Sequence, residues 1–446
     1  MSNADVIAAV ATPSGRGGIG IVRVSGCDLG VFAQAITGVV PEARVATRAE
    51  FLAADGSVID SGIALYFRSP ASYTGEDVLE LQGHGGPVIL QMLMRRCLEL
   101  GARIAEPGEF TRRAFLNDKL DLAQAEAVAD IIEAASVGAA RCALRSLKGE
   151  FSNEVNVIGN DLLMLRTWVE ATLDFPEEDI DATDRGEISA RLHALKEAVS
   201  RTLSKSEQGS ILRAGLNVVL VGRPNVGKSS LLNRFAREDV AIVTAIPGTT
   251  RDALRQTIQV RGIPVNIIDT AGLREASDEV EAIGIQRTWD SIGKADLVIL
   301  VVDASVGITA SDAAILAEFP SGLSRMTVFN KIDLVPIGSE VAAKGSDPAL
   351  FVSAKSGAGL DELQLAVERA SGWQASGEDV FVGRERHIVA LKEAFRALTL
   401  ASGLLDCPEL LAEELRRAHH SVGAITGEVS ADDLLGEIFS SFCIGK

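Results

Sequence analysis

The sequence predicts a multidomain protein of α/β and α+β class, with an N-terminal α+β domain and an all-α helical domain that is interrupted by an inserted α/β domain. Three observations predict this fold class. A G-x-x-x-x-G-K-S motif follows a short apolar run near the middle of the chain. Apolar residues recur at helical spacing on both sides of that region. Residues 1–118 instead combine short β-like runs with many glycines, which is typical of a compact α+β domain.

Size and composition narrow the functional classes. The chain has 446 residues, 47% of them apolar, and a net charge of −18. This composition indicates about two to four folded domains and excludes a largely disordered protein. The acidic balance argues against a broad basic surface, so any contact with RNA is expected to be local or shared with a partner. Residues 1–11 lack the features of an export signal, and the apolar run 297–302 is too short to cross a bilayer.

The cysteines are scattered, odd in number and without a C-x-x-C pair. They are Cys27, Cys97, Cys142, Cys407 and Cys443. This pattern argues against a disulfide framework or a structural zinc site. It favours a reducing, cytoplasmic location. Because the apolar runs are too short to span a bilayer, no membrane contact is expected.

The elements of the N-terminal domain are expected in the following order. Residues 18–24 and 62–67 alternate like β-strands, and a helix over 87–100 follows the Gly83-His84-Gly85-Gly86 turn.

Helices are expected on both sides of the inserted domain. Apolar residues at helical spacing predict a helix from about residue 120 to 147, and further helices over 154–173, 187–208, 386–403, 408–420 and 431–442. The simplest organisation is one helical domain split by the insertion, with Gly209 and residues 372–377 as hinges, because insertion at surface loops is well tolerated. Two separate helical appendages are the alternative. The expected boundaries are 1–118, 119–214, 215–375 and 376–446.

The central motif, Gly222 to Ser229, predicts a phosphate-binding loop. Residues 217–221 before it are expected to form a strand, and residues 228–235 a helix. A glycine-rich turn between strand and helix points backbone N–H groups at a phosphate, and the helix dipole favours the anion. Lys228 is expected to reach the β- and γ-phosphates, and the Ser229 hydroxyl to bind Mg²⁺.

Four further motifs follow in the order typical of guanine-nucleotide-binding domains. They are Thr249-Thr250, Asp269-Thr270-Ala271-Gly272, Asn330-Lys331-Ile332-Asp333 and Ser353-Ala354-Lys355. Thr250 is expected to bind Mg²⁺ and Asp269 to hold it through water. The Gly272 N–H can sense a γ-phosphate. Asp333 can accept two hydrogen bonds from guanine that adenine cannot donate, and a hydrogen-bonding site rejects an analogue without such groups by a factor of about 10⁴ or more.

Residues 215–375 are therefore predicted to form a GTP-hydrolysing domain, called the G domain below. The residues predicted to bind GTP are Asn225, Val226, Gly227, Lys228, Ser229, Ser230, Thr244, Ala245, Ile246, Pro247, Gly248, Thr249, Thr250, Asp269, Thr270, Ala271, Gly272, Asn330, Lys331, Asp333, Ser353, Ala354 and Lys355.

One position departs from the Ras-like pattern. Ras-like proteins place Gln after D-T-A-G to orient the attacking water, and this chain has Leu273 there. Either hydrolysis is very slow and the protein is a passive switch, or another residue completes the site. Asn225 could help to bind a monovalent cation that supplies positive charge. Arg251 and Arg274 are the alternative sources of that charge.

Motifs along the whole chain resemble the MnmE family, also called TrmE, of tRNA uridine 5-carboxymethylaminomethyl modification GTPases. The matching segments are Ala11-Thr12-Pro13, Gly15 to Gly20, Thr74 to Glu80, Gly83 to Pro87, Asn117 to Glu126 and the terminal Phe442-Cys443-Ile444-Gly445-Lys446.

The resemblance implies the following ligands and partners. The N-terminal domain would dimerise and bind 5,10-methylene-tetrahydrofolate, or 5-formyl-tetrahydrofolate as an analogue, through Arg23, Glu80, Lys119 and Lys446. Asn225, Thr244, Ile246 and Thr249 would bind K⁺, and Ser229 and Thr250 would bind Mg²⁺. Glu281 would position the hydrolytic water. With the FAD-containing subunit MnmG, the homodimer would add a carboxymethylaminomethyl or aminomethyl group to carbon 5 of the wobble uridine in certain tRNAs.

Other interpretations stay open for the flanking motifs and for the function. Arg23 could pair with a local carboxylate, Glu80 could be a solvated strand residue, and Lys119 could form a salt bridge at a helix start. Cys443 could be a buried structural cysteine, although the resemblance to the family is strongest in the terminal segment and favours a role in a site. The alternative function is a binding switch, a ribosome-assembly or signalling GTPase, in which the folate motifs and Cys443 have no role.

Overall fold

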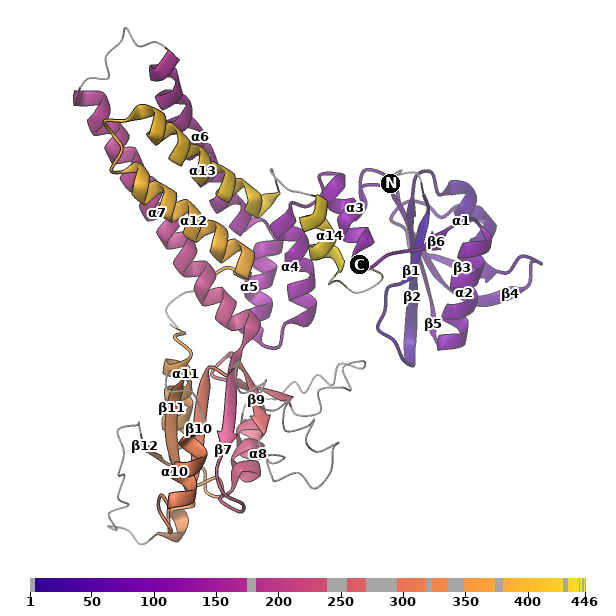
Figure 1. Cartoon of the computed structure of the whole chain (residues 1–446). Helices are drawn as coiled ribbons and strands as arrows, with labels where there is room; N and C mark the ends of the chain where they lie inside the picture. Colours follow the sequence, from indigo (N-terminus) through magenta and orange to yellow (C-terminus); the bar gives the residue numbers. More distant parts are fainter. Residues whose placement is uncertain are drawn as a thin grey trace, which may run out of the picture. The chain divides into compact units, whose positions relative to one another are not determined.

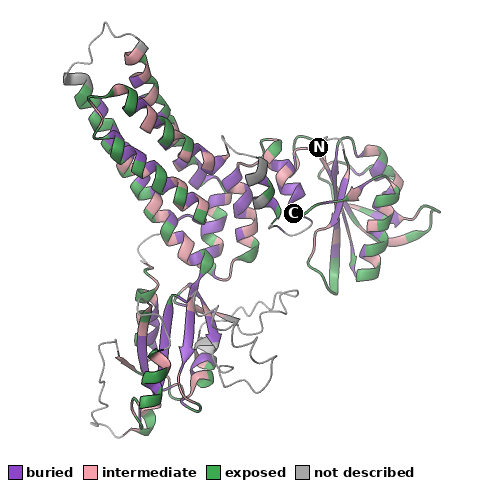
Figure 2. Ribbon diagram, viewed as in Figure 1, coloured by how far each residue is buried: buried purple, intermediate pink, exposed green. Residues whose placement is uncertain are grey.

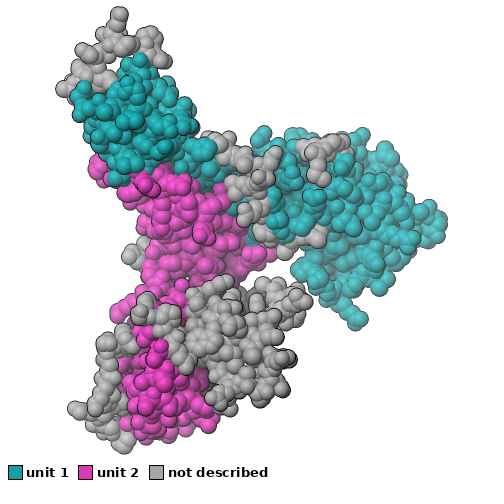
Figure 3. Space-filling model, in the orientation of Figure 1, with its two compact units in different colours: residues 1–129, 147–192, 397–446 teal, residues 130–146, 193–396 magenta. Residues whose placement is uncertain are grey.

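The structure is a computed structural model, and it describes residues 5–174, 182–238, 255–269, 295–317, 323–335, 349–373, 380–427, 432–440, 442 and 445. The chain forms two compact units (Figure 3). The first contains residues 1–129, 147–192 and 397–446, and the second contains residues 130–146 and 193–396. Among the described residues, no helix is both long enough and apolar enough to cross a membrane.

The N-terminal part of the first unit is built on a six-stranded sheet. In spatial order its strands are β3 (Thr47–Leu52), β4 (Val58–Phe67), β5 (Asp77–Gly85), β2 (Gly17–Gly26), β1 (Ile7–Val10) and β6 (Arg103–Ile104). Neighbouring strands are antiparallel except for β1 and β6. The expected strands at 18–24 and 62–67 lie within β2 and β4.

The two faces of this sheet have different coverings. Helices α1 (Gly30–Thr37) and α2 (Pro87–Glu99) pack on one face, where they bury aliphatic and aromatic side chains of the strands. On the other face, Phe110 of α3 (Glu109–Leu116) packs with Ile7 and Ala9. Arg23 lies opposite Glu80 in the β2–β5 pairing.

The remaining helices come before and after the G domain along the chain (Figure 1). They are α4 (Leu122–Glu133), α5 (Val137–Leu147), α6 (Glu150–Asp174), α7 (Ala182–Ala214), α12 (Glu385–Ala401), α13 (Pro408–Thr426) and α14 (Asp432–Ser440). Within the first unit, α6 and α13 pack side by side although most of the chain separates them. The prediction of a helical domain with an inserted G domain is confirmed.

Two local expectations were wrong. The single helix expected over about 120–147 is two helices, because Ser136 caps a new one: its Oγ accepts a hydrogen bond from the Ala139 N–H at 3.1 Å. Gly209 is not a hinge but lies inside α7. A Cβ atom at Gly209 would be 1.6 Å from the Phe381 carbonyl oxygen, so glycine is needed there for close packing of the backbone.

The G domain is built on a second six-stranded sheet. In spatial order its strands are β12 (Ala349–Phe351), β11 (Ser324–Asn330), β10 (Leu297–Asp303), β7 (Leu216–Val221), β9 (Ile263–Asp269) and β8 (Arg255–Val260). All neighbours are parallel except β8 and β9. The described helices of the domain are α8 (Lys228–Glu238), α10 (Ala310–Ala317), the 3-10 turn η1 (Ile332–Leu334) and α11 (Leu360–Ala370).

The sheet of the G domain is apolar through its centre. Residues 297–302 of β10 are all buried, and Figure 2 shows the central strands as buried. A strand that is covered on both faces reads as a continuous apolar run, as in parallel sheets generally. Because ligands of such sheets bind beyond the carboxyl ends of the strands, the polar residues that follow β7, β10 and β11 are placed to form a site.

Candidate functional site

The phosphate-binding loop connects the end of β7 to the start of α8, as predicted. Gly222 has φ of +142° and Gly227 of +97°, and Asn225 between them has φ of +63°. A Cβ atom at Gly222 would be 2.3 Å from the Val301 carbonyl oxygen. The backbone path of the loop therefore depends on glycine at this position.

Lys228 is held over this loop from the first turn of α8. Its Nζ donates hydrogen bonds to the carbonyl oxygens of Gly222 and Arg223, at 2.6 and 3.1 Å. Ser229, the next residue, is exposed. An ammonium group and a hydroxyl group at a helix N-terminus fit the phosphates of a nucleotide and an accompanying divalent cation.

Asn330 joins the phosphate-binding loop to the segment predicted to read the base. Its side chain is buried at the end of β11. Nδ2 donates to the Val226 carbonyl oxygen at 2.9 Å, and Oδ1 accepts from the Ala354 N–H at 3.0 Å. A Cβ atom at Gly227 would be 2.3 Å from Asn330 Nδ2. One amide thus fixes the spacing between three of the predicted motifs.

Lys331 forms the second connection between these loops. Its Nζ donates to the Asn225 carbonyl oxygen at 2.6 Å and to Asp303 Oδ2 at 2.8 Å. Burial alone would raise the pKa of Asp303, but hydrogen bonds from Lys331 and Ser305 outweigh it and lower that pKa. Asp303 therefore stays ionised and positions Lys331.

The sequence prediction missed Asp303. Its position directly after the apolar run 297–302, at the carboxyl end of β10, is the signal that could have identified it.

Asp333 lies in η1, beside the Ser353-Ala354-Lys355 motif. The Ser353 hydroxyl donates to Asp333 Oδ1 at 2.6 Å, and Ser353 itself is buried. This bond fixes the orientation of the carboxylate that is predicted to accept hydrogen bonds from guanine. Lys355 is exposed. The structure therefore brings the first, fourth and fifth predicted motifs together at the carboxyl edge of one sheet.

The other predicted site residues are not all described. Asp269 ends β9, as expected. Residues 244–250, 270–272, Glu281, Cys443 and Lys446 lie outside the described residues, so their predicted roles stay predictions.

The N-terminal domain holds a second candidate site around Arg23. Its guanidinium group pairs with Glu80, with Nε and Nη2 at 3.0 and 2.9 Å from Oε1. The guanidinium carbon also lies 5.6 Å from the centre of the Tyr73 ring and 5.8 Å from that of the Phe110 ring. Arg23 does pair with a carboxylate, as one interpretation held, but that carboxylate is the other predicted ligand residue. Lys119 Nζ donates to the Pro70 carbonyl oxygen at 2.9 Å, not to a helix-start carboxylate.

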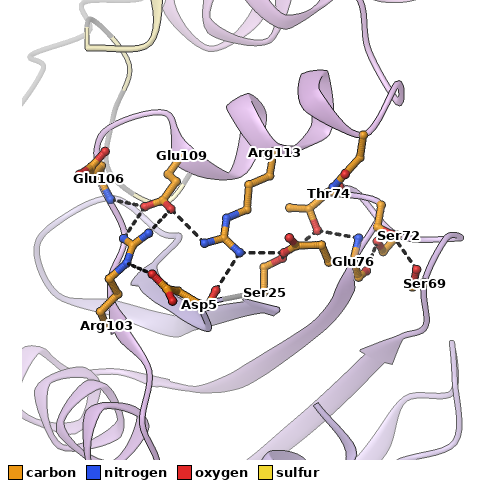
Figure 4. A network of polar contacts seen from close by, with 12 residues as sticks. Asp5, Ser25, Ser69, Ser72, Thr74, Glu76, Arg103, Glu106, Glu109 and Arg113 are labelled. Atoms are coloured by element: carbon orange, nitrogen blue, oxygen red, sulfur yellow. Dashed lines mark hydrogen bonds and ion pairs between the residues drawn. The ribbon is translucent and has the colours of Figure 1, made fainter. Parts of the chain in front are cut away.

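A buried ionic network lies in the same domain and was not predicted (Figure 4). Arg113 donates to Glu76 Oε2 at 2.9 Å and to Glu109 Oε1 at 3.0 Å, and all three side chains are less than 10% exposed. Glu76 also accepts from the Ser25 hydroxyl at 2.9 Å. Burial alone would raise the pKa of Glu109, but hydrogen bonds from Arg103, from a backbone N–H and from Arg113 outweigh it and lower the pKa to about 2.

A phosphate-binding loop that is joined through Asn330 and Lys331 to the segment predicted to read guanine has the arrangement of a GTPase of the phosphate-binding-loop class. Its family follows from the sequence as a whole. A family model described as the MnmE helical domain matches residues 122–443, and one described as the GTP-binding protein TrmE N-terminus matches residues 6–119. The chain belongs to the MnmE family.

Similar proteins cover the full length of the chain. A protein of Azoarcus sp. (strain BH72) named tRNA modification GTPase MnmE is 58% identical over 443 residues, which are 99% of this chain and 98% of that protein. A protein of the same name from Neisseria meningitidis serogroup C (strain 053442) is 56% identical and covers 100% of this chain and 99% of its own.

Solved structures resemble the chain in part. Era from Aquifex aeolicus bound to GDP·AlF4⁻ is 27% identical, covers 41% of this chain and 67% of its own, and gives a TM-score of 0.28. The G domain of the FeoB iron transporter from T. maritima is 26% identical, covers 35% of this chain and 98% of its own, and gives a TM-score of 0.27.

Proposed function

We propose that the chain is a K⁺-dependent GTPase that modifies tRNA as a homodimer together with the FAD-containing subunit MnmG. The complex adds a carboxymethylaminomethyl or aminomethyl group to carbon 5 of the wobble uridine in certain tRNAs, with the one-carbon unit from methylene-tetrahydrofolate. The observation that carries this proposal is the full-length identity to proteins named tRNA modification GTPase. A binding switch would not need the N-terminal domain that the family model matches.

In the proposed GTP site, this chain's residues bind and orient the nucleotide. Lys228 contacts the phosphates, and Asn330, Asp333 and the Ala354 N–H hold the base. Ser229 and Thr250 supply hydroxyl ligands for Mg²⁺, and Asn225, Thr244, Ile246 and Thr249 supply oxygen ligands for K⁺. The bound cations supply positive charge opposite the phosphates, where an arginine acts in other GTPases. Glu281 orients the hydrolytic water because Leu273 cannot.

In the proposed folate site, Arg23 and Glu80 offer complementary groups. The Arg23 and Glu80 side chains are 23% and 14% exposed, so the pair is held in place but open to a ligand. A reduced folate carries N–H donors on its ring and carboxylates on its tail, which suit a carboxylate and a guanidinium respectively. Lys119 and Lys446 complete the proposed binding set, and Cys443 acts in the modification itself.

Nucleoside analysis of tRNA tests the proposal. A strain that lacks this gene is complemented with the wild-type chain or with Cys443→Ser. The wild-type chain is expected to restore the modified wobble uridine, and Cys443→Ser to leave it absent while GTP hydrolysis continues. Modified uridine that persists in the deletion strain would instead favour the binding switch.

GTP turnover tests the proposed cation site separately. The full-length chain is expected to hydrolyse GTP faster in K⁺ than in Na⁺, and Glu281→Ala is expected to keep GTP affinity while it loses turnover. Equal rates in both salts would indicate that Arg251 or Arg274, and not a monovalent cation, supplies the positive charge at the phosphates.

A further inference from the structure

Asp130 lies where the chain enters and leaves the G domain. It belongs to α4, and its side chain is 3% exposed. Its Oδ1 accepts a hydrogen bond from Arg213 Nε at 2.8 Å and another from Arg384 Nη2 at 2.8 Å. Arg213 is in the last turn of α7, directly before the G domain, and Arg384 directly precedes α12, which follows the G domain. One carboxylate therefore holds both connections of an inserted domain.

The connection into the G domain is short and stiff. Only Gly215 separates α7 from β7, and its N–H donates to the Ile211 carbonyl oxygen at 2.9 Å. Strand β7 has six residues and leads straight into the phosphate-binding loop. Because no flexible segment lies between them, a shift of that loop along β7 would also displace Arg213.

The connection out of the G domain is pressed against α7. A Cβ atom at Gly209 would be 1.6 Å from the Phe381 carbonyl oxygen, and one at Gly383 would be 2.0 Å from the Ser206 carbonyl oxygen. Two cations also lie over the Phe381 ring, Arg145 at 5.4 Å and Lys205 at 5.3 Å from its centre. The backbone after the G domain thus follows α7 closely up to Arg384.

Space beside the carboxylate allows the arrangement to change. A cavity of about 230 Å³ is lined by Asp130, Glu133, Arg213 and Val382 among others. Arg213 is 38% exposed and Arg384 is 14% exposed, so the two arginines differ in their freedom to move. A buried carboxylate that loses one of its two partners keeps only the other, so its charge is less well compensated, which favours two discrete arrangements over a gradual change.

We propose that Asp130 is a positioning residue that locks the two connections of the G domain together, and that this lock makes α4, α7 and α12 respond to the bound nucleotide. Each of these helices continues along the chain into the first compact unit. The lock therefore couples GTP hydrolysis to the rest of the protein. The proposal rests on the GTPase activity. It rests on the proposed tRNA chemistry only where tRNA modification is used as a second measurement, described below.

Amide hydrogen exchange of the full-length chain tests the lock. Exchange is measured with GDP and with a slowly hydrolysed GTP analogue, on peptides that cover the phosphate-binding loop, α4 and α12. In the wild type, nucleotide-dependent differences are expected in all three. In Asp130→Asn, the differences in α4 and α12 are expected to fall roughly tenfold, within the range of about 5- to 150-fold typical of coupling between two sites. The difference at the phosphate-binding loop and the GTP affinity are expected to stay unchanged.

Three variants separate coupling from mere stability. Glu207→Gln is the matched control, because Glu207 pairs with Lys392 between α7 and α12 at 2.8 Å but lies on the exposed surface. It is expected to behave like the wild type. Asp130→Glu keeps the carboxylate and is expected to restore most of the coupling. Arg213→Gln, at a partly exposed position, replaces Asp130→Asn if that variant fails to fold, and the same loss is expected.

Two results of these experiments would contradict the proposal. A wild type without nucleotide-dependent exchange in α4 and α12 would overturn the proposal. So would an Asp130→Asn variant that melts at a lower temperature but keeps those differences, because the role would then be structural only. The second readout is tRNA modification, which is expected to fall in Asp130→Asn while GTP turnover continues. A wild type that modifies no tRNA would count against the proposed function, and the exchange result would still decide the lock.

Discussion

The two sheets of this chain use polar residues in opposite ways. In the G domain, the central strand β10 is apolar over residues 297–302, and the polar residues Asp303 and Asn330 come at the carboxyl ends of β10 and β11. In the N-terminal domain, polar residues such as Arg23 and Glu80 lie within the strands and pair across them. A parallel sheet that is covered on both faces must keep polar groups at its edge, whereas an antiparallel sheet can carry them on one face. The G domain therefore separates function from stability, and the N-terminal domain combines them.

Asp333→Asn should give the largest effect and should leave the sheet of the G domain intact. An amide in place of the carboxylate cannot accept both hydrogen bonds from guanine, so GTP affinity is expected to fall by up to about 10⁴-fold. Xanthine nucleotides, with an oxygen where guanine has the amino group, should bind better than to the wild type. Titration with both nucleotides measures this. Asp361→Asn, at an exposed position in the first turn of α11, is the control. Unchanged melting in both variants would support the separation of function from stability.

Arg113→Met should destabilise the N-terminal domain strongly. It leaves Glu76 and Glu109 buried without their shared partner, and breaking a buried ion pair in this way costs about 3–5 kcal/mol. Denaturant unfolding measures the loss, and GTP turnover should persist. Arg95→Met is the control: Arg95 is 83% exposed and pairs only on the surface of α2, where a change of about 1 kcal/mol or less is expected. Equal losses in the two variants would contradict the comparison of the sheets.

Acid should destabilise the N-terminal domain, because a carboxylate in its buried ionic network must be protonated. The pKa of Glu109 falls from its ordinary value of 4.5 to about 2 in the folded chain. A lowered carboxyl pKa stabilises the fold fully above the unfolded value and progressively less as the pH falls. The stability from Glu109, of the order of 3 kcal/mol at neutral pH, should therefore disappear between pH 4.5 and 2. Unfolding free energies measured across this range test the prediction, and Glu109→Gln should flatten the profile.

Glu80→Gln should give the smallest change in stability of these variants. Not every polar pair in the N-terminal sheet is expected to stabilise the fold strongly. The pair with Arg23 lies in the N-terminal sheet but is partly open to solvent, so a loss of about 1 kcal/mol is expected, well below that of Arg113→Met. Binding of 5-formyl-tetrahydrofolate should weaken in the same variant. Glu50→Gln, at an exposed position in β3, is the control for both measurements. A loss as large as that of Arg113→Met would place the pair among the buried structural groups.

The sequence predicted the G-domain site better than it predicted the N-terminal domain, for a physical reason. The phosphate-binding loop and the guanine-reading motif are short contiguous segments whose chemistry is local. The ionic network of Arg113 joins residues that are distant in sequence, and its pairing depends on how β-strands and α3 pack. Asp303 escaped prediction because its partner is Lys331, which directly follows the neighbouring strand β11.

Gly209 was not missed by the sequence analysis but was given the wrong role. A glycine in a helical pattern was interpreted as a hinge, but the close approach of Phe381 explains it, and only the fold shows that approach.

The packing of α6 against α13 has a consequence for synthesis on the ribosome. Roughly 230 residues separate the two helices, and translation of that stretch at about 5–20 residues per second takes on the order of 10–50 s. During this interval α6, whose Leu162, Leu165 and Val169 are buried in the folded chain, has no α13 to pack against. The G domain lies wholly within the segment between α6 and α13, and it can fold as it emerges from the ribosome. Once folded, it replaces a long flexible loop with a compact body, which reduces the entropy lost when α13 finds α6.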